Sequence, residues 1–121
     1  MTTINLFRNT DEYAAFEAGQ IVFERGQPGD VMYAVVEGEV EILLGERVID
    51  VALSGGIIGE MALIDSSPRS ATARARTACK LVPIGERRFI FLVQQTPFFA
   101  IQVMRIMADR LRRLMAATET V

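Results

Sequence analysis

Short apolar runs separated by glycine turns occupy the first two thirds of the chain. Between residues 16 and 84, runs of roughly four to eight residues are rich in Val, Ile and Tyr. Glycines interrupt these runs at positions 19, 26, 29, 38, 45, 55, 56 and 59. In the segment EGEVEIL, Val40 and Ile42 would face one side of an extended strand, and Glu39 and Glu41 the other. The pattern predicts a mainly β domain of the sandwich or barrel kind over about residues 16–84.

The pattern changes to helical spacing after Gly85. Residues 86–117 contain no glycine and one proline, Pro97. We predict a short helix over residues 86–95 and a longer helix that continues to residue 117, with Thr96 as its N-cap and Pro97 at its first position. The first fifteen residues are expected to add a further helical segment. The apolar stripe of the long helix steps by four and three, through Ala100, Met104, Met107, Leu111 and Leu114.

This stripe is expected to pack on the β domain. The same spacing is that of a coiled-coil seam, so a homodimer through residues 97–117 stays open as an alternative. A chain of 121 residues suits a single domain with one core, and we predict one domain over residues 1–121. Flanking helices would therefore complete a mainly β fold.

Composition narrows the class of protein. Half of the residues are hydrophobic and the mean hydropathy is +0.27, but every 18-residue window contains charged or turn residues, so we expect no membrane span. The N-terminus lacks the basic and apolar regions of a signal peptide, and Cys79 is the one cysteine, so a cytoplasmic location is expected.

The chain contains no histidine, which removes the commonest general acid–base and metal-binding side chain. With one cysteine, zinc and most transition-metal sites also lack ligands. No P-loop, no complete dinucleotide-binding glycine motif and no G-x-S-x-G nucleophile motif occurs. We therefore expect neither an enzyme nor a bound metal or cofactor. A metal-dependent jelly-roll enzyme of the cupin kind is disfavoured because cupins hold metal largely through histidines.

Residues 59–72, GEMALIDSSPRSAT, carry the candidate chemistry. Gly59 allows close approach of the backbone to a ligand, and the EMAL segment after it can form a helical turn with outward N–H groups. Arg69 can bind a phosphate through two hydrogen bonds, whereas Glu60 needs a hydroxyl donor. A ribose phosphate fits both. The alternative is an ordinary Glu60–Arg69 salt bridge across the turn.

This segment closely resembles the phosphate-binding cassette of the cyclic nucleotide-binding domain family, found in catabolite activators, kinase regulatory subunits and cyclic-nucleotide-gated channels. FEAGQIVFERGQPGDVMYAVVEGEVEIL resembles the opening strands of that family and FIFLVQQTPFFAIQVMRIMADRL its closing helices. The resemblance implies a double-stranded β-helix, also called a β-roll or jelly roll, over about residues 16–84, followed by C-terminal helices over 86–117. It also implies a bound 3′,5′-cyclic nucleotide. Gly56 and Ile58 depart from the acidic and aromatic residues that are common in the family.

The resemblance assigns a role to each residue of the segment. Gly59 would begin the cassette, Glu60 would accept from the ribose 2′-OH, and Arg69 would clamp the cyclic phosphate. The phosphate cage would be completed by backbone N–H groups of Met61, Ala62, Ser70 and Ala71. We expect cAMP as the favoured ligand. Because a hydroxyl at this position can hydrogen-bond guanine, Ser70 keeps cGMP open.

The resemblance further implies a signalling sensor whose last helix, residues 97–117, moves as a lid. The base would be capped by a residue from the set Leu111, Arg112, Arg113 and Leu114. No helix-turn-helix follows, so we expect no nucleic-acid binding by this chain, and action through a protein partner or a fused effector. The alternative is a ligand-free β-roll scaffold or dimerisation module.

Overall fold

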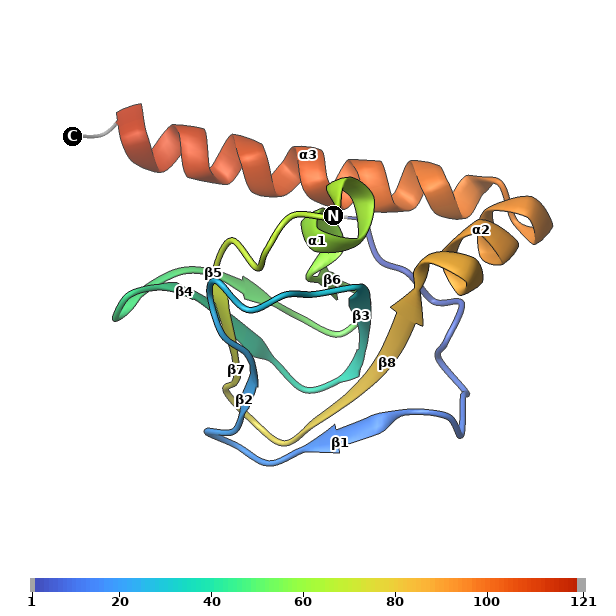
Figure 1. Ribbon diagram of the computed structural model, residues 1–121, viewed down its shortest axis with the longest axis horizontal. Helices are drawn as coiled ribbons and strands as arrows, with labels where there is room; N and C mark the ends of the chain where they lie inside the picture. The colour runs from blue at the N-terminus through green and yellow to red at the C-terminus, as the bar shows by residue number, and fades with distance from the viewer. Residues whose placement is uncertain (1, 120–121) are drawn as a thin grey trace.

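The computed structural model describes residues 2–119 and contains two antiparallel four-stranded sheets (Figure 1). The first sheet has the order β1 (Ala14–Phe16), β8 (Cys79–Gly85), β3 (Val31–Glu37) and β6 (Ile57–Ile58). The second has the order β2 (Ile21–Phe23), β7 (Thr72–Ala75), β4 (Val40–Leu44) and β5 (Arg47–Ala52). The predicted β-roll with C-terminal helices is thus confirmed.

The alternation predicted for the EGEVEIL segment is also confirmed. Val40 and Ile42 of β4 are buried in a cluster between the two sheets. Glu41 lies on the other face, directly opposite Arg74 of β7, and the two side chains form an ion pair of 2.7 Å. Such a cross-strand pair of opposite charges suits the outer face of a sheet.

Two apolar clusters divide the core. One lies inside the roll and includes Val35 of β3 and Leu81 of β8. The other joins the outer face of the first sheet to the helices and to the N-terminal segment, through residues such as Met32 of β3 and Phe99. Strands β3 and β8 therefore face apolar neighbours on both sides, which explains their nearly continuous apolar sequence.

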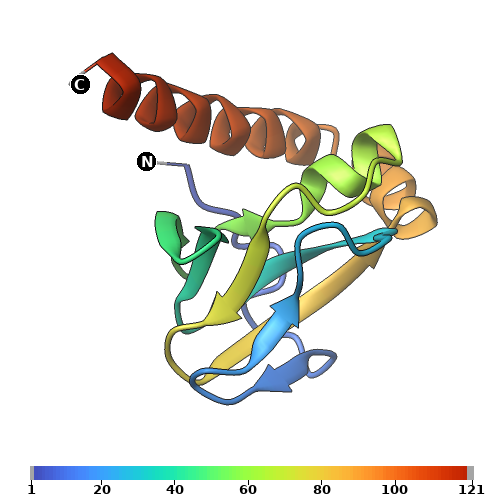
Figure 2. The ribbon, with the colours of Figure 1, turned by 60° about the vertical axis from the view of Figure 1, so that its left-hand side comes forward.

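Three helices complete the fold: α1 (Glu60–Asp65), α2 (Glu86–Gln95) and α3 (Phe98–Glu119). Helix α2 has the predicted bounds, and α3 begins one residue later than predicted. Thr96 is the C-cap of α2, and its carbonyl oxygen accepts from the amide of Phe99 at the start of α3. Figures 1 and 2 both show α3 passing over α1 and one edge of the roll.

The prediction of which α3 stripe packs on the roll is only partly correct, since Met107 packs against the core but the most deeply buried residues of the helix belong to another stripe. The buried residues are Phe99, Val103 and Ile106, whereas Met104 and Leu111 are 54% and 58% exposed. The buried residues also step by four and three, but they begin one residue earlier than the predicted stripe. Because two apolar stripes run side by side on α3, the spacing by itself cannot select the one that faces the core.

The N-terminal segment contains turns and no helix between residues 2 and 13, so that prediction is wrong. Ile4 donates its amide to the carbonyl of Gly55 at 2.6 Å, and Phe7 packs edge-on against Phe99 with ring centroids 6.4 Å apart. Figure 2 shows the N-terminus beneath α3, where Gln102 donates to the carbonyl oxygen of Thr3. Tertiary contacts replace helical hydrogen bonds in this segment.

Within residues 2–119, no single helix is long and apolar enough to cross a membrane. The pair α2 and α3 reaches such a length and composition only when both helices are taken together, across a bend of 117°.

Candidate functional site

A cavity of about 220 Å³ lies between the second sheet, α1 and α3. All seven residues predicted for the binding site line it. These are Gly59, Glu60, Met61, Ala62, Arg69, Ser70 and Ala71. The other lining residues are Phe23, Ile42, Leu44, Ile49, Arg110 and Leu114. The structure therefore brings the two ends of the 59–72 segment together around one space.

Gly59 makes the turn from β6 into α1. It is the N-cap residue of α1, in the left-handed region with φ of 75°, and no side chain caps the helix. A Cβ atom here would stand 2.6 Å from Nη1 of Arg69 and 3.2 Å from the ring of Phe23. Both the backbone angle and the space beside Arg69 require glycine.

Arg69 is a buried cation, with 6% of its surface exposed. Its Nη1 donates to the carbonyl oxygen of Gly59 at 3.2 Å, and its guanidinium stacks on the ring of Phe23 at 4.1 Å. Its Nε is the one buried side-chain nitrogen or oxygen without a hydrogen-bond partner in the described part of the chain. Gly29 packs closely against the same side chain, since a Cβ there would stand 2.2 Å from Nε.

No carboxylate of the described residues lies within ion-pair distance of Arg69. Burial lowers the pKa of Arg69, and the charges of Tyr33, Asp30 and Glu60 only partly oppose this shift. The guanidinium nonetheless stays charged, because an arginine is not deprotonated in proteins. A buried, charged guanidinium without a carboxylate is an arrangement that an anion would complete.

Glu60 is buried as well, at 5% exposure, but its partner comes from another element. Nη1 of Arg110, in α3, donates to its Oε1 at 2.6 Å. The alternative of a Glu60–Arg69 salt bridge is therefore wrong for this structure. Glu60 and Arg69 therefore do not form an ion pair with each other, and each can interact separately with a ligand in the cavity.

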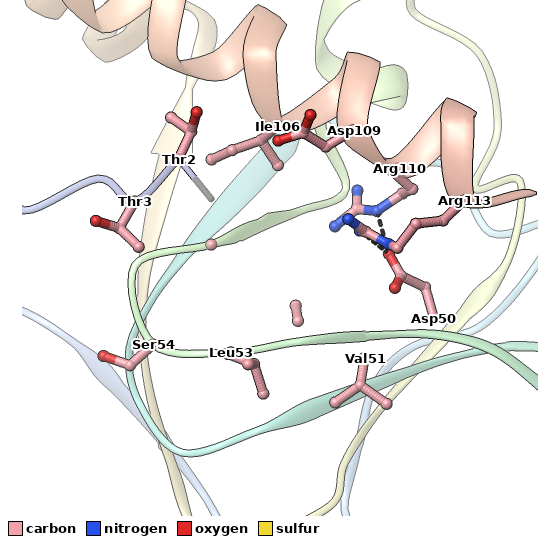
Figure 3. Close-up of a pocket in the computed structure, with 12 residues that line it drawn as sticks. Thr2, Thr3, Asp50, Val51, Leu53, Ser54, Ile106, Asp109, Arg110 and Arg113 are labelled. Atoms are coloured by element: carbon pink, nitrogen blue, oxygen red, sulfur yellow. Dashed lines mark hydrogen bonds and ion pairs between the residues drawn. The ribbon is translucent and has the colours of Figure 1, made fainter.

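Arg110 also donates from Nε to Oδ2 of Asp50 at 2.7 Å and from Nη2 to the carbonyl oxygen of Ile57 at 2.8 Å. Nη2 of Arg113 donates to the same Oδ2 at 3.0 Å. Burial alone would raise the pKa of Asp50, but the hydrogen bonds from Arg113 and Arg110 outweigh it and hold this pKa below its ordinary value. Figure 3 shows both arginines of α3 pointing at this carboxylate.

A second cavity, of about 360 Å³, lies on the other side of Arg110 (Figure 3). It is enclosed by β5, the turn after β5, α3 and the N-terminal residues Thr2 and Thr3. Arg110 lines both cavities, so it forms part of the wall between them.

Sequence reasoning missed Arg110 and Asp50 as neighbours of the site. The signal for Arg110 is its position, since it continues the buried stripe of Phe99, Val103 and Ile106 by one further step of four. Asp50 carries no comparable signal. Of the four residues predicted to cap a base, Leu114 lines the cavity, whereas Leu111, Arg112 and Arg113 do not. Leu111 is exposed, and the two arginines pair with Asp109 and Asp50 instead.

Comparisons with known proteins identify the family of this domain. Residues 14–96 match the model of the cyclic nucleotide-binding domain. A cAMP-dependent protein kinase regulatory subunit of Emericella nidulans is 36% identical over 76 residues, covering 61% of this chain and 18% of the relative. The cAMP-activated global transcriptional regulator CRP of Escherichia coli is 28% identical over 98% of this chain and 58% of the relative.

Among solved structures, the Thermus thermophilus catabolite activator protein superposes with a TM-score of 0.76 and 27% identity. This alignment covers 90% of the present chain and 54% of that chain. The present chain thus spans less than two thirds of the length of these relatives.

Proposed function

This chain belongs to the cyclic nucleotide-binding domain family, and on that premise we propose that it binds a 3′,5′-cyclic nucleotide in the cavity beside α1. We further propose cAMP as the preferred ligand and a non-catalytic sensor role. The observation that carries the proposal is Arg69, a buried guanidinium that has no carboxylate partner among the described residues and stands in the wall of that cavity.

The cyclic phosphate is assigned to the end of the cavity at Arg69. The first turn of α1 has no side-chain cap, so backbone N–H groups of Met61 and Ala62 are available as donors. Ser70 and Ala71 offer further backbone donors beside Arg69. A charged phosphate would supply the anionic partner that the guanidinium lacks.

The ribose and the base are assigned to the opposite side of the cavity. Glu60 would accept from the ribose 2′-OH while Arg110 stays on its Oε1, because a carboxylate offers about four acceptor positions on two oxygens. Ile42, Leu44 and Ile49 form an apolar wall suited to the flat face of a purine. This wall suits adenine and guanine alike, and cAMP is proposed as the preferred ligand because the kinase regulatory subunit and the regulator CRP named above are described as cAMP-dependent and cAMP-activated.

Signal transmission is assigned to α3. Arg110 and Leu114 bring α3 to the cavity, so a ligand that contacts them binds one position of the helix better than others. The ligand can shift the equilibrium between two positions of α3 only by the difference between its binding free energies for those two positions. The signal would then pass to a protein partner or a fused effector domain.

Calorimetric titration tests the proposal directly. Wild-type protein should bind cAMP more tightly than cGMP, and adenosine, which lacks the phosphate, should bind far more weakly than either. Arg69→Ala should weaken cAMP binding by about 2 to 4 kcal/mol, or roughly 30- to 1,000-fold. Arg74→Ala removes an arginine that is paired with Glu41 outside the cavity, and should leave affinity unchanged. Wild-type protein that binds neither cyclic nucleotide would rule the function out.

A second candidate function, dimerisation of a ligand-free scaffold, is favoured by one observation. Helix α3 exposes a second apolar stripe, and its members are Phe98, Ile101, Met104, Leu111 and Met115. A dimer that forms with rising protein concentration and does not respond to cAMP would support this function. The double variant Met104→Glu/Leu111→Glu should then be monomeric, and retained dimers would exclude this face of α3.

A further inference from the structure

Asp50 does not line the cavity assigned to the nucleotide, but it holds a side chain that does. Its carboxylate is 10% exposed and accepts from both Arg110 and Arg113 at one oxygen, Oδ2. Figure 3 shows it on β5, directly below the two guanidinium groups of α3. Asp50 therefore fixes the position of Arg110 from the side opposite to Glu60.

The guanidinium of Arg110 is held along three directions. Nε donates to Asp50, Nη1 to Glu60 and Nη2 to the carbonyl oxygen of Ile57. Two of these partners are carboxylates, so the positive charge of Arg110 is shared between them. Arg113 is a second cation on Asp50, and the four side chains together form a cluster with no net charge.

Removal of the Asp50 charge would change how Arg110 divides its ion pairs between Asp50 and Glu60. Glu60 would then be the one anionic partner of Arg110 among the described residues, and the guanidinium, held otherwise only by the carbonyl oxygen of Ile57, could turn to pair with both oxygens of Glu60. A carboxylate that accepts a hydrogen bond from the guanidinium at each oxygen has fewer of its about four acceptor positions left for a further hydroxyl. A ribose 2′-OH would have to compete with Arg110 for Glu60.

We propose that Asp50 is a positioning residue for ligand selectivity: it retains Arg110 on one oxygen of Glu60, so that the carboxylate can recognise a ligand with a ribose 2′-OH. This inference rests on the proposed binding of a cyclic nucleotide and goes beyond it. It assigns the discrimination between ribose and deoxyribose to a residue outside the cavity.

The test is the ratio of two affinities, measured by calorimetry with cAMP and with 2′-deoxy-cAMP. In wild-type protein the 2′-OH should strengthen binding by about 10- to 100-fold, the usual value of a hydrogen bond to a charged group. In Asp50→Asn this ratio should fall at least about fivefold, while affinity for 2′-deoxy-cAMP changes less than about threefold. Asp50→Ser provides a second neutral variant with a smaller side chain.

Glu41→Gln is the matched control. Glu41 also pairs with an arginine at 2.7 Å in the same sheet and is mostly buried, but it does not line the cavity. The ratio of the affinities for cAMP and 2′-deoxy-cAMP in Glu41→Gln should equal the ratio in wild-type protein. An equal loss of affinity for both nucleotides in Asp50→Asn would reveal a general structural role and overturn the inference. An unchanged ratio would also overturn the inference, and so would a failure of both Asp50 variants to fold.

The outcomes also separate this inference from the proposed function. Wild-type protein that binds cAMP, with an unchanged ratio in both Asp50 variants, would leave the function standing and remove only the role of Asp50. Wild-type protein that binds neither nucleotide would remove both.

Discussion

Replacement of Arg69 by methionine should weaken cAMP binding at least about 30-fold without weakening the ligand-free domain. A buried side chain that packs as tightly as Arg69 would ordinarily be expected to stabilise the fold. Its charge, however, is desolvated without a carboxylate partner, and its Nε lacks a hydrogen bond. Methionine keeps the unbranched stem of Arg69 as far as the position of Nε, and its flexible thioether can settle against the neighbouring ring of Phe23.

The magnitude follows from the contacts that change. The variant loses one hydrogen bond to the carbonyl oxygen of Gly59, at 3.2 Å, and the stacking on Phe23. Together these are worth about 3 kcal/mol. It is relieved of the desolvation of an unpaired charge, which costs several kcal/mol. The free energy of unfolding of the ligand-free variant should therefore equal that of wild-type protein or exceed it by up to about 2 kcal/mol.

Urea denaturation followed by circular dichroism, with and without cAMP, measures both effects. At a cAMP concentration 100 times the dissociation constant, wild-type protein should gain about 2.7 kcal/mol, because the ligand binds only the folded state. Arg69→Met should gain less than about 0.9 kcal/mol at the same concentration, the value that corresponds to binding weakened about 30-fold. Arg74→Met is the control, because this arginine is paired and lies outside the cavity. It should keep the full gain from cAMP.

Two results would refute this reasoning. A ligand-free Arg69→Met protein less stable than wild type by more than about 2 kcal/mol would mean that the guanidinium is a structural element of the core. A variant that keeps the full stabilisation by cAMP would place the phosphate elsewhere.

Three further predictions test the framework of the site. Gly59→Ala should cost about 1 to 3 kcal/mol of stability and weaken cAMP binding, because a Cβ atom meets Arg69 at a φ of 75°; denaturation and calorimetry measure these effects. Phe99→Ala should cost about 3 to 5 kcal/mol in urea denaturation, whereas its exposed neighbour, in Phe98→Ala, should cost less than about 0.5 kcal/mol. Similar losses for both would contradict the packing of α3. Since the folded-state pKa of Asp50 lies below its ordinary value of 3.8, its stabilisation is present above that pH and is lost as the pH falls below it; Asp50→Asn should lose less stability between pH 5 and pH 3.

The β-roll and the residues of the 59–72 segment that line the cavity could be predicted because their signals are local. The alternation around Val40 and the spacing from Gly59 to Arg69 each lie within a short stretch of sequence. The packing face of α3 could not be predicted in this way, because the stripes of Met104 and Val103 are both apolar over the first half of the helix and lie side by side.

The prediction of an N-terminal helix was wrong for a related reason. The spacing of Ile4 and Phe7 suits a helix, but both side chains reach the core from a backbone that bonds to Gly55 instead. The partnership of Asp50 with Arg110 joins positions 60 residues apart, and no local pattern records it.

Glu60 and Arg69, the two buried charged residues of the 59–72 segment, differ in whether they have a partner of opposite charge. Arg69 is held by Gly29, Gly59 and Phe23, all within the roll and its turns, and no carboxylate of the described residues pairs with it. Glu60 already forms an ion pair with Arg110, which belongs to α3. On the proposed function, the phosphate of the nucleotide therefore supplies affinity at a rigid site. The ribose instead meets a carboxylate whose other partner is the helix, so this half of the ligand can bias the position of α3. Binding strength and signalling would then depend on different atoms of the same ligand, and Arg110 is the side chain that connects them.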